Sequence, residues 1–290
     1  MFFDSHTHIN NDDYTEEARL ELIKEIEKSD VDFVMDVGFD PASSVMAAEH
    51  AAKYEWCYAA AGCHPHDTDK MDDIQLGIIK SLARKEKVKA IGEIGLDFHY
   101  DLSPRDIQCK WFRKQIQLAN ELRMPIIIHA READEEVMNI LKEEGAFSKE
   151  RCGWFPPRVL KDLEPAENAA ALEGFETGKE YPDARVVLHC FSGSAELGKQ
   201  YVKLGATLSA AGPLTYKNSK KGIKVVQSVP IQFLFVETDA PYLTPEPLRG
   251  RPNMSPYVRY TAAKVAEIKG MQLEDVAAIT CDNARRFFEI

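Results

Sequence analysis

The feature that most limits the fold of this chain is a regular alternation of short apolar runs with longer amphipathic segments. Such alternation is typical of βα units whose strands form a parallel sheet. The apolar runs predict eight strands, at residues 2–5, 32–37, 56–61, 88–92, 125–129, 185–189, 206–209 and 233–237. A spacing of about 3.6 residues predicts helices between them, at residues 16–29, 41–54, 74–85, 104–122, 133–144, 195–204 and 219–229.

Eight such units predict an α/β fold of the (β/α)₈ TIM-barrel type. The C-terminal segments 255–269, 273–279 and 283–288 are expected to be helices that close the ring. A chain of 290 residues fits a single domain over residues 1–290. A doubly wound open sheet uses the same alternation, but it gives no reason for polar residues to recur at the strand ends.

One long segment, residues 146–184, interrupts the alternation before the sixth strand. Connections of this length are uncommon unless they fold or serve a purpose. A connection that leads from a helix to a strand lies at the bottom face of a barrel, so we expect this insert to be remote from the chemistry. A partly helical decoration or a subunit contact is the favoured interpretation.

Five of the predicted strands end in, or are followed at once by, side chains that can bind a metal. His6 and His8 lie two residues apart, so in a strand they point to the same side and can bind one cation. Singly, such residues can also be core histidines or helix-capping acids, but that explanation would have to hold at every strand end. The other candidates are Glu93, His129, His189 and Asp239.

Four imidazoles and two carboxylates are more ligands than one tetrahedral cation takes, and they suit two divalent cations. Glu93 is the expected bridge and, with Asp239, a catalytic residue. Two ions roughly 3.5–4 Å apart would acidify a shared water, whose proton Asp239 would accept as general base. The ligand types leave Mg, Mn and Zn open. The expected sites are His6, His8, Glu93 and Asp239 for one ion, and Glu93, His129 and His189 for the other.

Five further side chains are expected to bind the substrate through its anionic oxygens. These side chains are His64 and His66 after the third strand, Arg131 after the fifth, and Arg249 and Arg251 in the Pro-rich loop 241–252. The alternative for the two histidines is an ordinary Gly/Pro turn that exposes them, and the alternative for the arginines is ordinary surface salt bridges.

Cys190 could suggest a cysteine nucleophile beside His189. Adjacent residues on a strand point to opposite faces, so we expect the thiol to face away from the metal ligands and to pack as a small apolar side chain. Neither a dinucleotide-binding nor a P-loop signature is found in the sequence.

Taken together, the blocks of chemically active residues resemble the TatD family of metal-dependent deoxyribonucleases, a branch of the amidohydrolase-like barrels. The blocks follow the family's order: DSHTH at 4–8, GCHPH at 62–66, GEIGLD at 92–97, HAR at 129–131, HCFSG at 189–193 and ETDAPYL at 237–243. The resemblance implies a TIM barrel, a two-metal site on the six candidate ligands, and hydrolysis of phosphodiester bonds in DNA in the 3′ to 5′ direction. Two departures are Met254, where the family usually has an acid after the preceding Asn, and the length of the insert.

Charge and cysteine content narrow the possible partners and the location. A balance of 36 Lys+Arg against 47 Asp+Glu, a formal charge of −11, argues against a broad basic surface, so DNA would be held locally as a substrate. Six cysteines without a C-x-x-C pair indicate free thiols. With no membrane span or signal peptide in the sequence, a cytoplasmic protein is expected, with no membrane partner and no obligate protein partner.

Two other functions remain open. A barrel of this kind can hydrolyse a small amide, lactone or phosphoester, because fold does not determine function. Related amidohydrolases often bridge their metals with a modified lysine at strand four, and Glu93 in that place favours the phosphoesterase branch. A non-catalytic metal-binding or nucleic-acid-binding module is the third class, and the negative charge argues against simple electrostatic binding.

Overall fold

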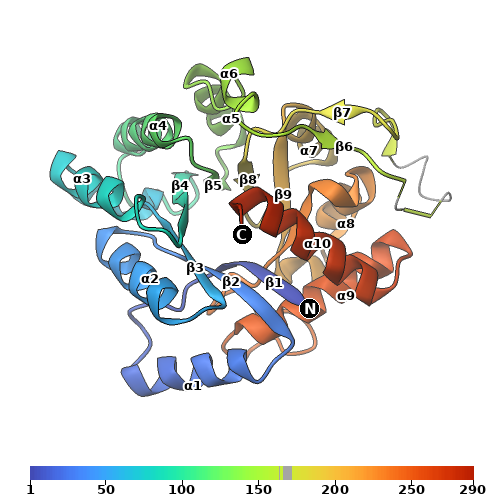
Figure 1. Ribbon diagram of the computed structural model, residues 1–290, viewed down its shortest axis with the longest axis horizontal. Coiled ribbons are helices and arrows are strands. Elements are labelled where there is room, and N and C mark those ends of the chain that lie inside the picture. The colour runs from blue at the N-terminus through green and yellow to red at the C-terminus, as the bar shows by residue number, and fades with distance from the viewer. Residues whose placement is uncertain (163, 166–171) are drawn as a thin grey trace.

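Eight parallel strands form the sheet at the centre of this protein, whose computed structural model describes residues 1–162, 164–165 and 172–290. The strand order is β1-β2-β3-β4-β5-β8-β9-β10, and a parallel bridge between Thr7 and Ala240 brings the two edges together. Helices surround the sheet on the outside (Figure 1). The predicted (β/α)₈ barrel is confirmed.

The observed elements lie close to the predicted segments. The barrel strands are β1 (Phe2–Thr7), β2 (Val31–Val37), β3 (Cys57–Ala61), β4 (Val88–Asp97), β5 (Ile126–Arg131), β8 (Val186–Leu188), β9 (Ala206–Ala210) and β10 (Leu234–Val236). The outer helices are α1 (Glu16–Glu27), α2 (Pro41–Lys53), α3 (Asp73–Leu82), α4 (Arg105–Leu122), α5 (Asp134–Glu143), α7 (Ala195–Lys203), α8 (Lys220–Ser228) and α9 (Val258–Lys269). Strand β4 is longer than expected, so that Glu93 lies inside the strand and not after it.

Side chains at the loop–helix junctions set where several helices begin. Asp40 accepts a hydrogen bond from the backbone N–H of Ser43 and forms a capping box at the start of α2. Asp72 and Gln75 form the same motif at α3. These caps satisfy backbone donors that the first helical turn leaves unpaired, so each helix starts at a defined place on the barrel.

The last helix, α10 (Leu273–Phe288), does not join the ring. It lies across the N-terminal end of the barrel, where Asn283 donates to the carbonyls of Ile231 and Leu234 at the start of β10 (Figure 1). Phe287 and Phe288 are buried there in one cluster with inward-facing strand residues. The prediction that residues 273–288 form two helices that close the ring is wrong, because the aromatic end of one continuous helix fills the barrel's lower mouth.

The insert at 146–184 lies at the same N-terminal end. It contains a short helix α6 (Lys149–Cys152) and an antiparallel pair, β6 (Arg158–Val159) with β7 (Glu180–Tyr181). Arg158 donates to the hydroxyl of Thr207 at the start of β9, at 2.6 Å. The expected helical character is limited to α6 among the described residues. The Ala-rich stretch 166–171 lies outside them, and a subunit contact stays a prediction.

Within the described residues, none of the helices is both long enough and apolar enough to cross a membrane.

Candidate metal centre

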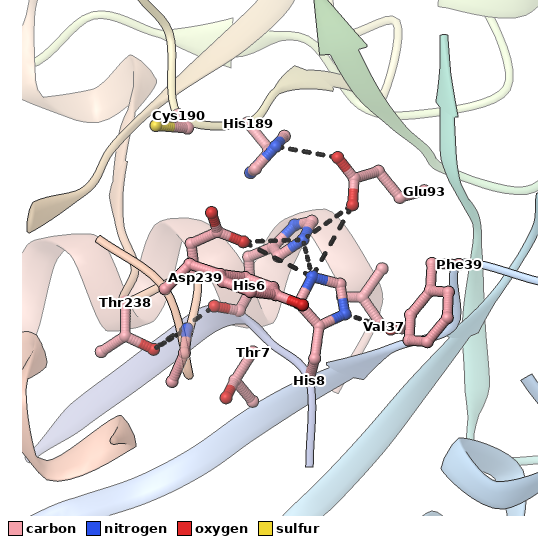
Figure 2. Close-up of polar contacts among 12 residues, drawn as sticks. His6, Thr7, His8, Val37, Phe39, Glu93, His189, Cys190, Thr238 and Asp239 are labelled. Carbon is pink, nitrogen blue, oxygen red and sulfur yellow. Dashed lines mark hydrogen bonds and ion pairs between the residues drawn. The ribbon is translucent and has the colours of Figure 1, made fainter. Parts of the chain in front are cut away.

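Four donor atoms, from the end of β1 and the residue after it, from β4 and from the segment after β10, form a compact group at the C-terminal end of the barrel (Figure 2). His6 Nε2 lies 3.2 Å from His8 Nε2, 3.3 Å from Glu93 Oε2 and 3.8 Å from Asp239 Oδ1. His8 Nε2 lies 3.7 Å from Glu93 Oε2 and 3.4 Å from Asp239 Oδ1. Ligands about 2.1 Å from a tetrahedral Zn²⁺ are about 3.4 Å apart, so this group has the spacing of a cation site.

A second group of donors surrounds the other oxygen of Glu93. Glu93 Oε1 lies 2.9 Å from His129 Nδ1, 2.9 Å from His189 Nε2 and 3.7 Å from His64 Nε2. Because Oε2 faces the first group and Oε1 faces the second, this carboxylate can bridge two cations. His64, expected to contact substrate, is placed among these donors, and the ligating atoms of His64, Glu93 and His129 lie within 4.8 Å of one another.

Hydrogen bonds at the far ring nitrogens orient three of these imidazoles. His8 Nδ1 lies 2.7 Å from the carbonyl of Val37, and His189 Nδ1 lies 3.1 Å from Glu237 Oε1. His129 Nε2 lies 3.1 Å from Asp97 Oδ2. Metal-binding histidines have this arrangement, because donation from one nitrogen leaves the lone pair of the other directed at the ion.

The residues that hold the site together were missed as functional positions, although two of them stand in the blocks quoted above. Asp97 accepts from both His66, at 2.9 Å, and His129. Glu237 positions His189. A glycine-rich strand that continues past Glu93 to another acid was the available signal for Asp97. For Glu237, the signal was an acid two residues before Asp239.

Asp4 connects β1 to the segment that carries Asp239. Its carboxylate accepts from the hydroxyl of Thr238 at 2.6 Å and from the Thr238 backbone N–H at 2.9 Å. Burial raises the pKa of Asp4 to about 7, against the lowering effect of these hydrogen bonds. Removal of this link would free the loop that presents Asp239.

The two acidic donors remain ionised in this environment. Burial by itself raises the pKa of Glu93, but the imidazoles of His189, His64 and His6 together hold that pKa well below its usual range. Burial likewise opposes ionisation of Asp239, whose pKa is lowered by its hydrogen bond with His8 and by nearby imidazoles. Ionised carboxylates beside imidazole lone pairs are a donor set that suits Zn²⁺ or Mn²⁺.

The histidines divide into two classes. Burial lowers the pKa of His6 and, with its neighbour His129, takes that of His64 well below its usual range. For His189 burial also lowers the pKa, but Glu93 and Glu237 outweigh it and raise the pKa well above the usual range. Metal binding would therefore release a proton from His189, because an imidazole nitrogen cannot hold both.

The donor groups open into a cavity of about 950 Å³. His64, His66 and Arg131 line it, as expected for substrate contacts, and the guanidinium of Arg131 lies 4.6 Å from the ring centre of Tyr100. Arg249 and Arg251 do not line it, although the structure places Arg249 over the ring of Tyr216, which does. A contact of Arg249 or Arg251 with the substrate stays a prediction.

Cys190 differs in part from its prediction. Its sulfur points away from the donor atoms (Figure 2), but the residue lines the cavity and is not packed in the core. The alternation of a strand does not apply, since β8 ends at Leu188 and Cys190 has a φ of 43°. Burial raises the pKa of the thiol, so it stays protonated and is no nucleophile.

A parallel barrel whose C-terminal end gathers two groups of histidine and carboxylate donors beside a cavity defines a class, the barrel hydrolases that depend on metal ions. The sequence signature described as TatD related DNase matches residues 3–289. The chain belongs to this family.

Individual relatives support the assignment over the whole chain. The uncharacterized metal-dependent hydrolase YabD of Bacillus subtilis is 41% identical over 290 residues, which cover 100% of both chains. The 3′-5′ ssDNA/RNA exonuclease TatD of Klebsiella pneumoniae is 29% identical over 277 residues, or 93% of this chain and 91% of that protein. The crystal structure of the TatD homologue YJJV of Escherichia coli superposes with a TM-score of 0.80 at 23% identity, over 100% of this chain and 98% of the other, which shows the shared fold.

Proposed function

We propose that this protein hydrolyses phosphodiester bonds in DNA, from the 3′ end, with two divalent cations. One ion would be held by His6, His8, Glu93 and Asp239, and the other by Glu93, His129 and His189. The observation that carries the proposal is the position of the Glu93 carboxylate, whose two oxygens face two separate donor groups. The activity named for the Klebsiella pneumoniae relative supports the choice of substrate.

When bound, the cations would lower the pKa of a water molecule and neutralise charge on the phosphate oxygens. Asp239 acts as general base in this proposal. Its side chain is 13% exposed, against 4% for Glu93, and it lines the cavity from which water and substrate arrive. Its pKa lies below the usual range, so it is ionised at neutral pH and can accept the proton of the attacking water.

Arg131 binds the substrate. Its guanidinium is at the cavity wall beside the second donor group, since Arg131 comes two residues after His129. A planar guanidinium matches two phosphate oxygens at once, and its stacking on Tyr100 limits the directions it can take. His64 and His66 line the same wall, where Asp97 orients His66.

The experiment is metal analysis of the purified protein, coupled to a metal-dependent assay on labelled single-stranded DNA beside a panel of lactones and amides. About two ions per chain and DNA cleavage that a chelator abolishes are expected. Hydrolysis of a lactone or amide with intact DNA would replace the proposal with the amidohydrolase alternative. Intact substrates throughout, with metal bound, would favour the non-catalytic class.

Arg131 and Arg251 offer a matched pair in the same assay. Arg131→Ala should raise KM for DNA by roughly tenfold, because a charge-assisted contact with phosphate is lost. Arg251→Ala should change KM less than about twofold, since this exposed arginine does not line the cavity. Equal losses in the two variants would count against a cavity-bound phosphate.

A further inference from the structure

Asn10 lies two residues after His8, in the loop that follows β1, and its side chain is buried. The side-chain amide donates to Asp36 Oδ1 at 2.7 Å and to the carbonyl of Val37 at 3.0 Å, both at the end of β2. The backbone N–H of Asn10 also donates to Asp36 Oδ1, at 3.3 Å. None of these contacts has a part in the proposed mechanism, although they lie next to a candidate metal ligand.

The carbonyl oxygen of Val37 links Asn10 to the first donor group. His8 Nδ1 points at this oxygen from a distance of 2.7 Å (Figure 2), and the amide of Asn10 reaches the same atom. A carbonyl oxygen has two lone pairs and no proton, so it can accept from both side chains at once. The contact requires a proton on His8 Nδ1, which leaves the lone pair of Nε2 for a cation.

Asp36 and His50 hold the amide of Asn10 in its place. The carboxylate of Asp36 is buried, and while its Oδ1 accepts from Asn10, its Oδ2 lies 2.7 Å from His50 Nδ1. His50 belongs to α2, and its side chain is 12% exposed. A buried carboxylate is unfavourable unless hydrogen bonds satisfy it, so Asp36 keeps both partners close. A continuous chain of contacts therefore runs from α2 through the end of β2 to His8.

The oxygen of the Asn10 amide distinguishes this network from ordinary packing. Among the described residues, Asn10 Oδ1 has no hydrogen-bond partner, although the atom is buried. The reverse orientation of the amide would direct that oxygen at the carboxylate of Asp36, where two acceptors would repel each other. The amide is therefore oriented by the groups to which its nitrogen donates. An unpaired buried acceptor lowers stability, and a side chain with a purely structural role has no reason to contain one.

We propose that Asn10 is a positioning residue of the metal centre. Its amide fixes the direction of the Val37 carbonyl, and that carbonyl holds the ring of His8 with Nε2 toward the other donors of its group. This assignment deepens the proposed function, on whose two-ion site it rests, but it does not depend on the substrate.

The second donor group has supports of its own. Asp97 orients His129, and Glu237 orients His189, and neither acid contacts the network of Asn10. The two ions therefore depend on different parts of the scaffold. Loss of the Asn10 amide should weaken binding of the first ion and leave the second ion as it is.

The first experiment counts the ions and measures their affinities by calorimetric titration of metal-free protein with zinc or manganese. Asn10→Leu keeps the approximate size of the side chain but donates no hydrogen bond. One of the two ions should bind about 10–100-fold more weakly, while the other keeps its affinity. Anomalous scattering from crystals of the variant soaked in manganese should show that the weakened site is the one between His6, His8 and Asp239.

Asn283→Leu is the matched control. The amide of Asn283 also donates to two backbone carbonyls, at 2.8 and 3.0 Å, but at the opposite end of the barrel. This variant should lose stability without a change in either metal affinity. Equal weakening of both ions in Asn10→Leu, or wild-type affinity for both, would overturn the assignment, because a purely structural residue gives one of these two results.

His50 provides a second test, which keeps the assignment falsifiable even when Asn10→Leu does not fold. His50→Leu removes the contact with Asp36 Oδ2, so it should weaken the same ion by about three- to tenfold. His50→Asn places an amide nitrogen near the position of Nδ1 and should restore wild-type affinity. Equally low affinity in both variants would overturn the assignment, and so would wild-type affinity in both.

These measurements are independent of the proposed reaction, because they count ions and use no substrate. Selective loss of one ion from Asn10→Leu, in a protein whose wild type leaves DNA intact, would support the positioning role and defeat only the proposed function. An Asn10→Leu protein that keeps both ions and cleaves DNA at the wild-type rate would overturn the positioning role and leave the proposed function in place.

Discussion

The two ends of this barrel both contain buried charged groups, but they are arranged in different ways. At the N-terminal end Asp183 lies 3.1 Å from Arg158 Nη2, 2.9 Å from Arg286 Nη1 and 3.4 Å from Arg185 Nε. At the C-terminal end the nearest neighbours are often of the same kind, as in the 3.2 Å separation between the Nε2 atoms of His6, in β1, and His8, directly after it. One end joins opposite charges, while the other gathers electron-pair donors.

At the N-terminal end, other protein groups accept or donate most of the hydrogen bonds that Asp183 and its arginines can form. Arg158 and Asp183 form a two-pronged pair, Arg158 also donates to the carbonyl of Gln232, and Arg185 donates to the carbonyl of Phe287. The donors at the C-terminal end converge without a positive charge among them that is as permanent as a guanidinium. Buried charged groups therefore stabilise the fold at the N-terminal end of the barrel and form a binding site at the C-terminal end.

Glu93→Gln should have the largest effect, and it should act mainly on activity. Removal of the negative charge that faces both donor groups takes away several kcal/mol of transition-state stabilisation, so kcat/KM for DNA should fall by about 10³-fold or more. The free energy of unfolding of the metal-free protein should change less than in Asp183→Ala, because Gln keeps the shape and can still hydrogen-bond with the imidazoles of His129 and His189. Steady-state kinetics and urea unfolding measure the two quantities. Near-normal cleavage by Glu93→Gln would contradict a functional role for the donors at the C-terminal end.

Asp183→Ala should have the opposite profile. It leaves Arg158 and Arg185 without their shared carboxylate, and the loss of one partner from a buried ion pair costs about 3–5 kcal/mol of stability. Activity per folded molecule should remain within about twofold. Glu267→Ala removes an acid from an exposed pair with Lys264, so as the matched control it should cost less than about 1 kcal/mol.

Metal removal should destabilise the protein through the C-terminal end only. A cation at 100 times its Kd adds about 2.7 kcal/mol to the free energy of unfolding. Zinc or manganese should therefore raise the Tm of the wild-type and Asp183→Asn proteins alike, but not that of Glu93→Gln. Scanning calorimetry with and without chelator measures this shift, and an equal response in Glu93→Gln would place the cations elsewhere.

Asp97→Asn should have a smaller effect at the metal site. Asp97 accepts from both His66 and His129, and the loss of such a supporting contact lowers metal affinity or activity by about 10–100-fold. The exposed Asp101, which pairs with Arg105 at 2.9 Å, provides the control substitution Asp101→Asn. Titration of metal by calorimetry would show equal affinity in the two variants if Asp97 had only a structural role.

The smallest expected effect is a loss of stability in acid, through the ion pairs of Asp183 at the N-terminal end. Burial alone would raise the pKa of Asp183, but Arg158, Arg185 and Arg286 lower it below its usual value. The folded state thus binds fewer protons than the unfolded state, so the stabilisation is complete above about pH 4 and is lost as pH falls toward the folded-state pKa. Urea midpoints measured down to pH 3 should fall less in Asp183→Asn than in wild type, and parallel curves would contradict this.

Much of the site could be expected from the sequence for a simple geometric reason. The ends of parallel strands meet at one edge, so residues that directly follow apolar runs, such as His129 and Asp239, had to come together once the barrel closed. The exceptions follow the same logic. Arg249 and Arg251 lie in a long loop whose path no periodicity determines, and Cys190 lies just beyond the end of β8, where strand alternation no longer applies.

Local chemistry along the chain determined the number of strands, the helices between them and the identity of the residues at the catalytic edge, because apolar spacing and capping residues act over a few positions. Tertiary structure alone decided that α10 fills the lower mouth of the barrel and that the two oxygens of Glu93 face different histidines. These features depend on contacts between segments far apart in the sequence, such as Ser5 and Val236, which are 231 residues apart and meet only after the sheet has closed.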